Sequence, residues 1–297
     1  MSNFTRKLLR FSVLLLAVGF GMMVAGGVMT RGAGTYEREL TEEIPASTYD
    51  YGEVSGIVLN ATAGVVNVLS SDDEFRVESR NMRTENFSCE LRNGVLYISE
   101  TSEYASAGSR SWRGISNTIR NILDLGQERR LGITETSHLT VFIPDGKRLD
   151  YLHVSQNVGR INLDNINADQ LTIELDGGDV FVTEANCLSL DVDIALGNCR
   201  VSGLTADRVE SSVDAGNLSL DGKITNTGKF KCQLGRIALQ LDGRAGDYSI
   251  DAKTDLGSIT IDGARVNSGS YRPLGTASDA PRLSLDCDLG EISLNFN

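Results

Sequence analysis

Cysteine, histidine and aspartate are the residues of this chain whose types could carry chemistry, and their spacing decides which chemistry. The five cysteines are Cys89, Cys187, Cys199, Cys232 and Cys287. Their number is odd and no Cys-x-x-Cys pair occurs, so a disulfide framework is not indicated. The two histidines, His138 and His153, have no partner at metal-ligand spacing. The pattern favours buried free thiols, which behave as small apolar groups, over a single disulfide or a metal site.

Paired aspartates could bind calcium, and two carboxylates across a cleft could hydrolyse a glycosidic bond. The aspartate pairs are Asp72-Asp73, Asp191 with Asp193, and Asp286 with Asp288. They match neither the calcium-binding nonapeptide nor the EF-hand, so solvated aspartates on an outward strand face explain them better.

Sequence motifs of serine hydrolases, zinc proteases, P-loop enzymes and dinucleotide-binding domains do not occur. A carbohydrate-active β-helix is the enzyme alternative, but it needs two carboxylates over a cleft. Coils of about nineteen residues leave no long loops to form such a cleft. We therefore expect a protein that is not an enzyme, without catalytic residues, cofactor or metal.

A repeat of glycines predicts the elements that must position these residues. The glycines that recur every nineteen residues are Gly159, Gly178, Gly197, Gly216 and Gly235. Apolar residues stand at positions −7, −5, +2 and +4 relative to each glycine almost throughout, with polar residues between them. The same pattern returns around Gly64, Gly257 and Gly290. Alternation of this kind predicts two short strands with a corner at the glycine.

A fixed period near twenty residues is typical of stacked repeats. We predict an all-β fold, a single-stranded parallel β-solenoid resembling a β-helix, with coils of about 19 residues. The four apolar columns should lie inside, with positions −3 and +7 mixed. Cys199 at +2, and Cys232 and Cys287 at −3, fall in these interior columns. A β-sandwich of short strands is the alternative, because it too has regularly spaced turns.

Residues 1–31 lack the repeat pattern and have the composition of a membrane-spanning segment. Arg6, Lys7 and Arg10 precede an uncharged run from Phe11 to Thr30. A helix of that length spans about 30 Å, the thickness of a bilayer core. We expect an uncleaved single-pass transmembrane anchor with a cytoplasmic N-terminus and an extracellular remainder. A cleaved signal peptide is the alternative, with Val24-Ala25-Gly26 as its processing site.

The expected domains are therefore the anchor with its basic flank (1–31), a linker (32–52) and the solenoid (53–297). Four of the 28 basic residues precede position 32 and none of the 40 acidic ones does, which leaves a net charge of −16 for the rest. Such an acidic surface excludes nucleic-acid binding through a basic face.

An irregular insert is expected over about 72–138. It begins with a strand-like segment at 75–77 and a hairpin from Cys89 to Ile98, turning at Asn93-Gly94. Apolar residues at helical spacing then predict one short amphipathic helix near 113–125. The residues that we select here as a possible contact with a partner are Arg110, Trp112, Arg113 and Arg120. The sequence favours capping of one end of the solenoid or lateral packing for this insert. Contact with a partner or a membrane surface, and disorder, are the alternatives.

The segment from Leu139-Thr-Val-Phe-Ile-Pro144 to Val154, the Gly-x-Ile-x-Leu repeats and the C-terminal Leu289-Gly-Glu-Ile-Ser-Leu294 resemble the DUF4097 family. The resemblance covers about 53–71 and 137–297. Members of this family are described as candidate adhesins and are related to the toastrack domains of bacterial envelope-stress proteins. The resemblance implies a bacterial surface β-solenoid, often behind one transmembrane helix, and brings no catalytic residues.

Two functions without catalysis compete. In the first, the solenoid is an interaction or scaffold module that docks against envelope or membrane proteins and helps to report envelope stress. In the second, it is an adhesin that binds surface polymers or neighbouring cells. A stack of seven or eight coils is only about 35–40 Å long at about 4.8 Å per coil, and a short linker keeps it near the membrane. This geometry favours the first function.

Overall fold

The computed structural model describes residues 47–71, 75–80, 87–100, 137–266, 270–271 and 280–297. The predicted transmembrane helix and the predicted helix near 113–125 lie outside these residues. In the described part of the chain, no helix is both long and apolar enough to cross a bilayer. The described residues belong to one compact unit, residues 44–297.

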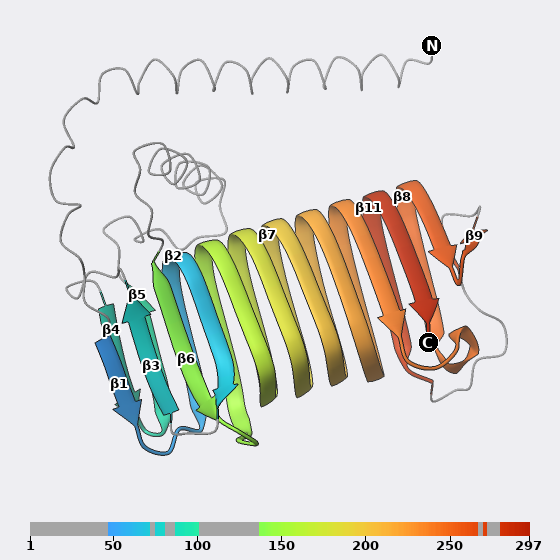
Figure 1. Ribbon diagram of the computed structural model, residues 1–297. Helices are drawn as coiled ribbons and strands as arrows, with labels where there is room; N and C mark the ends of the chain where they lie inside the picture. Colours follow the sequence, from blue (N-terminus) through green and yellow to red (C-terminus); the bar gives the residue numbers. More distant parts are fainter. Residues whose placement is uncertain (1–46, 72–74, 81–86, 101–136, 267–269, 272–279) are drawn as a thin grey trace, which may run out of the picture. The chain divides into compact units, whose positions relative to one another are not determined.

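The described elements are almost all strands, joined in one sheet that winds on itself (Figure 1). They are β1 (Ser47–Tyr51), β2 (Gly56–Ser71), β3 (Phe75–Arg80), β4 (Phe87–Arg92), β5 (Val95–Glu100), β6 (His138–Pro144), β7 (Leu149–Leu241), the 3-10 turn η2 (Ala245–Asp247), β8 (Ser249–Ile261), β9 (Ala264–Val266), β10 (Ser270–Tyr271) and β11 (Arg282–Phe296). The continuous element β7 is 93 residues long and contains all five glycines of the regular repeat. Its successive turns form the solenoid, which confirms the all-β solenoid part of the predicted fold class.

The glycines stack into a column that runs through the coils. Gly64 of β2 is the parallel register partner of Gly159. A Cβ built on Gly178 would lie 1.9 Å from the carbonyl oxygen of Gly159, and one on Gly216 would lie 1.6 Å from that of Gly197. No side chain fits in that space. Glycine is therefore required by the close approach of neighbouring backbones at this corner.

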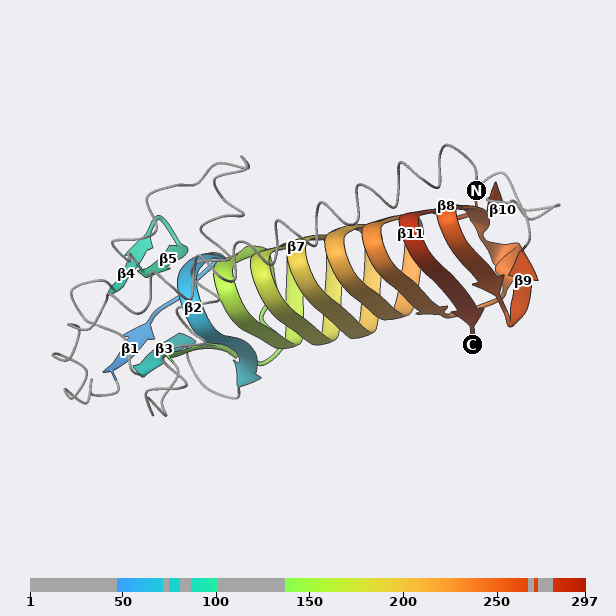
Figure 2. The same cartoon turned by 90° about the horizontal axis from the view of Figure 1, so that it is seen from above.

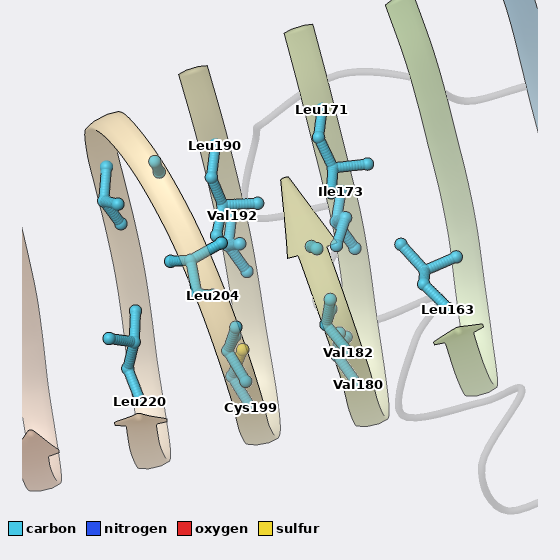
Figure 3. Packing of buried hydrophobic residues seen from close by; sticks show 14 of the residues in the cluster. Leu163, Leu171, Ile173, Val180, Val182, Leu190, Val192, Cys199, Leu204 and Leu220 are labelled. Carbon is cyan, nitrogen blue, oxygen red and sulfur yellow. The ribbon is translucent and has the colours of Figure 1, made fainter. Parts of the chain in front are cut away.

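Apolar side chains fill the interior in columns on both sides of the glycines, as the alternation predicts. In the coil of Gly178, Leu171, Ile173, Val180 and Val182 are all buried, and Figure 3 shows their equivalents repeated in the neighbouring coils. Each such side chain contributes about 1.5–3 kcal/mol when it is fully buried. The parallel register of the coils is that of a solenoid, whereas a sandwich has antiparallel sheets.

The predicted interior positions of the cysteines are confirmed. Cys199, Cys232 and Cys287 are at most 2% exposed, and Cys187 is also buried. Cys89 in β4 is half-buried.

The coils are not stacked in sequence order at the C-terminal end, contrary to our expectation. β11 pairs in parallel with β7 on one side and with β8 on the other, so it lies between them (Figures 1 and 2). Gly290 therefore stacks on Gly235, and Gly257 stacks on Gly290. The outer side of β8 is paired instead with the short antiparallel strands β9 and β10.

At the other end of the sheet, β2 pairs in parallel with β5 and β6, and antiparallel strands follow beyond these two. Most of these strands come from the stretch 72–138 that was expected to be irregular. β3 and the hairpin β4–β5 lie in this stretch, and the hairpin turns at Asn93-Gly94 as predicted. β3 pairs with β6, and β1 pairs with β3, both antiparallel. The unpaired edge of a parallel ladder invites association with other chains, and at this end the antiparallel strands cover it.

Candidate interaction surface

Exposed leucines gather at the corner that the glycines form. Leu196, Leu234, Leu256 and Leu289 each directly precede a stacked glycine, and their side chains are 45–58% exposed. The glycine that follows each leucine turns the chain, so the leucine lies outside the apolar columns. Large apolar side chains at equivalent positions of successive coils form a continuous stripe rather than scattered exposure.

The sheet register brings three of these leucines side by side. Leu289 is the register partner of Leu234 on one strand and of Leu256 on the other. Neighbouring coils are about 4.8 Å apart, so the side chains of the three leucines lie within contact distance. Ala215 occupies the same position in the next coil, followed by Leu196. We call this set of residues, Leu196, Ala215, Leu234, Leu289 and Leu256, the leucine corner.

Polar residues border the leucine corner on the side that precedes it in each coil. Asp214, Gln233, Asp288 and Asp255 are exposed there. Gln233 Nε2 donates to Asp214 Oδ1 at 2.6 Å. Partial burial and the neighbouring charge of Asp193 raise the pKa of Asp214. This border is therefore acidic, with an amide that bridges two coils.

The other border is a ladder of hydrogen bonds and one ion pair. Asn217 Nδ2 donates to Asn198 Oδ1, and Asn198 Nδ2 donates to Asp179 Oδ1, both at 2.8 Å. Farther along, Arg236 and Glu291 pair at 2.7 Å. These side chains bond to one another between coils, which holds them in place beside the leucines. An apolar centre with a polar rim is the usual anatomy of a protein-binding surface.

The described residues hold no cluster of three or more potential metal ligands. Burial raises the pKa of Cys187 and of Cys199 to about 12, and that of Cys287 also to about 12. Thiols with such pKa values stay protonated and are poor nucleophiles.

A cleft of about 530 Å³ lies where β11 enters the sheet. Its lining includes Lys229 and Arg282, and Asp251 is its one carboxylate. Lys229 pairs with Glu210 at 3.5 Å. Glycoside hydrolysis requires two carboxylates across the cleft, and the described lining supplies one.

The predicted contact residues Arg110, Trp112, Arg113 and Arg120 lie outside the described residues, so their role stays a prediction. The structure does show where their segment joins the sheet. Its flanking strands β5 and β6 pair with the two halves of β2, on either side of Gly64. A Cβ on Gly64 would lie 2.3 Å from the carbonyl oxygen of Ser137, so Ser137 continues the glycine column. Glu100 and Ser137, which flank residues 101–136 in the sequence, therefore both lie beside the corner of β2.

Both ends of that segment are bonded to the corner of β2. The Thr62 backbone N–H donates to Glu100 Oε2 at 2.9 Å, and Ser137 Oγ donates to the Ala63 carbonyl at 2.8 Å. Burial raises the pKa of Glu100. Glu100 and Ser137 thus lie at the same corner of the coil that carries the leucines farther along the column.

The leucine corner was not predicted from the sequence, although its signal was present. Among the glycines of the repeat pattern, four are preceded by leucine, at 196–197, 234–235, 256–257 and 289–290. Each of these dipeptides places a large apolar residue outside the alternating pattern.

The fold and this surface define an all-β solenoid with a stacked glycine corner and an exposed apolar stripe. The family model Toastrack DUF4097 matches residues 54–295, and the chain belongs to this family. No curated protein matches it.

Several solved structures are similar in fold at low identity. A candidate cell adhesion protein from Clostridium sporogenes is 12% identical, with 85% of this chain and 99% of that chain covered and a TM-score of 0.39. A candidate adhesin from Bacteroides fragilis is 12% identical, with 86% and 98% covered and a TM-score of 0.42. A candidate lipid binding protein from Parabacteroides distasonis is 12% identical, with 86% and 98% covered and a TM-score of 0.41.

Proposed function

We propose that this protein is a membrane-anchored interaction module of the bacterial cell envelope, and that the leucine corner is the surface through which it docks partner proteins. The observation that carries the proposal is the alignment of exposed leucines in consecutive coils. A stable solenoid does not need them, because its interior columns are already filled. Contiguous exposed apolar residues with a polar rim are typical of a surface that binds another protein.

The anchor is part of this proposal. Its support is the uncharged run from Phe11 to Thr30 behind a basic flank. The solenoid would then face the outside of the cell, and a single-pass helix would hold it near the membrane. The eight stacked glycines span only about 34 Å at about 4.8 Å per step. A body of this length reaches envelope proteins more readily than distant surfaces.

Arg110, Trp112, Arg113 and Arg120 belong to the proposal as a second contact. The described residues that flank their segment, Glu100 and Ser137, both bond to the corner of β2. A partner that lies along the glycine column would therefore meet both the leucine corner and this basic segment. Basic side chains there would complement an acidic partner.

Adhesion to surface polymers is the second candidate function. The observation that favours it is the ladder of Asp179, Asn198 and Asn217, which repeats polar groups at the coil spacing. Repeated amides and carboxylates on a regular lattice suit a repetitive polymer. The proteins similar in fold include candidate adhesins.

Photo-crosslinking in living cells separates the two functions. A photoreactive amino acid replaces Leu234 or Leu289 in the full-length protein, and the matched control carries it at Leu188, a leucine that is 56% exposed outside the corner. Specific protein adducts from Leu234 and Leu289, absent from Leu188, support the interaction module. Adducts with wall polymer, or equal adducts from all three positions, overturn it.

The contribution of the insert is measured in the same assay. A chain without residues 106–130 should give fewer adducts from Leu289 if the basic segment is a second contact. Unchanged adducts would remove Arg110, Trp112, Arg113 and Arg120 from the proposal but leave the leucine corner in place.

A further inference from the structure

Two of the five cysteines lie next to each other in the sheet although they are far apart in sequence. Cys232 in β7 and Cys287 in β11 are register partners on neighbouring parallel strands. Both occupy the −3 position of their coil, and both point into the interior, where their exposure is 2% and 0%. The structure holds them as free thiols.

The spacing of the two residues meets the requirement for a disulfide. Neighbouring strands lie about 4.8 Å apart, and disulfides form between residues whose Cα atoms are about 4.4–6.8 Å apart. The two side chains extend from the same side of the sheet, and each thiol affects the pKa of the other. Their other contacts are weak: Cys232 Sγ donates to the Gly216 carbonyl and Cys287 Sγ to that of Gly235, both at 3.7 Å.

We propose that Cys232 and Cys287 form a disulfide bond that fastens β11 to β7. The two thiols lose two protons and two electrons, and a disulfide oxidant, such as oxidised glutathione or an oxidised dithiol protein, is reduced to two thiols. This inference does not depend on the proposed function, because the bond follows from the register of the two strands.

The other cysteines have no such partner in the described residues. Cys89 is the register partner of Ile98. The residues nineteen positions before and after Cys187 are alanines, and those around Cys199 are Val180 and Leu218. The proposed bond is therefore specific to one pair, and three thiols remain free.

The bond forms while the chain folds. In the folded protein both sulfur atoms are closed off from solvent, so an oxidant reaches them only before β11 is in place. Once formed, the bond lies inside the solenoid and resists reductants under native conditions. It also lies two residues before Leu234 and Leu289, so it holds together the two strands that carry the centre of the leucine corner.

Oxidative refolding of the purified protein tests this proposal. The reduced, unfolded protein is refolded in a mixture of reduced and oxidised glutathione, unfolded again in an alkylating reagent, and mapped by mass spectrometry without reduction. We expect three alkylated cysteines and one linked pair of peptides that contain Cys232 and Cys287. Closing so long a loop should raise the melting temperature by about 10 °C over the reduced protein.

Two variants serve as matched controls. Cys199→Ala should keep the linked peptides and the difference in melting temperature, and Cys232→Ala should lose both. Five alkylated cysteines in the refolded wild-type protein would overturn the proposal, and so would a bond to Cys89, Cys187 or Cys199. This result is obtained on the wild-type chain, so it does not depend on whether a variant folds.

Discussion

Replacement of Gly216 by alanine introduces one methyl group at the centre of the glycine column. That Cβ would lie 1.6 Å from the carbonyl oxygen of Gly197, which is backbone and cannot rotate away. Gly216 also has a φ of +148°, a conformation that residues with a side chain rarely adopt. Alanine therefore meets two obstacles at once, a collision with the neighbouring coil and an unfavourable backbone angle.

The expected cost follows from these two terms. To restore an ordinary contact of at least 3.4 Å, the two coils must separate by more than an ångström at the corner. This movement breaks roughly two hydrogen bonds of the ladder, at about 1 kcal/mol each. The backbone angle adds about 1–3 kcal/mol. We expect Gly216→Ala to lower the free energy of unfolding by about 4 kcal/mol.

Variants of two other glycines separate the steric contribution from the contribution of the backbone angle. Gly263 has a φ of +75°, and nothing lies within 4 Å of a Cβ built on it. Gly263→Ala therefore places alanine at a positive φ but causes no steric collision. We expect a loss of about 1–2 kcal/mol there. Gly246 has neither obstacle, and Gly246→Ala should be neutral or stabilise the fold by up to about 1 kcal/mol. Urea unfolding, followed by circular dichroism in the strand band, ranks the three variants against the wild-type protein.

The decisive comparison is between Gly216→Ala and Gly263→Ala. If their free energies of unfolding differ by less than about 1 kcal/mol, backbone crowding at the corner has no large energetic role. The glycines would then be explained by their φ angles alone, and our account of the column would be wrong.

Four further variants test individual side chains. Leu285→Ala, which truncates a side chain 1% exposed, should cost about 2–5 kcal/mol, whereas Leu289→Ala on the surface should stay within about 0.5 kcal/mol in the same urea assay. Asp214→Asn should be more stable than wild type at pH 7. Because the pKa of Asp214 is raised in the folded state, the wild-type protein becomes more stable as the pH falls through that pKa. The stability advantage of Asp214→Asn should therefore be gone below the ordinary aspartate pKa of 3.8. Urea titrations at successive pH values measure this change. Asn198→Ala removes its bonds to Asp179 and Asn217 and should cost about 1 kcal/mol in thermal unfolding.

The period of nineteen residues was enough to predict the coils and their interior, because alternation of apolar and polar residues states directly which side chains face inward. The order of the last two coils could not be predicted in this way. The repeats of Gly257 and Gly290 have the same pattern, so either order fills the columns. The difference lies in the strands that follow β8, because β9 and β10 occupy its outer side, whereas β11 has parallel partners on both sides.

The exposed leucines of the leucine corner could not be predicted from the repeat either. The interior columns have an apolar residue in almost every repeat, so the sequence alone predicts them. The position before the glycine varies between alanine, valine, glycine and leucine, so it does not form such a column in the sequence. Only the stacking brings Leu234, Leu289 and Leu256 together, since Leu256 precedes Leu289 in sequence but follows it in the sheet.

The position of β11 has a consequence for how the protein is made. A ribosome completes β8 and its antiparallel strands before it has made the 15 residues of β11. Until those residues are released, β8 has no parallel neighbour and the main body of coils ends at an open edge on β7. A strand that is synthesised after β8, β9 and β10 therefore completes the middle of the stack rather than its end. A premature stop codon after residue 281 would remove an internal layer and separate the terminal coil from the body, so quality-control proteases should recognise such a chain as unfinished.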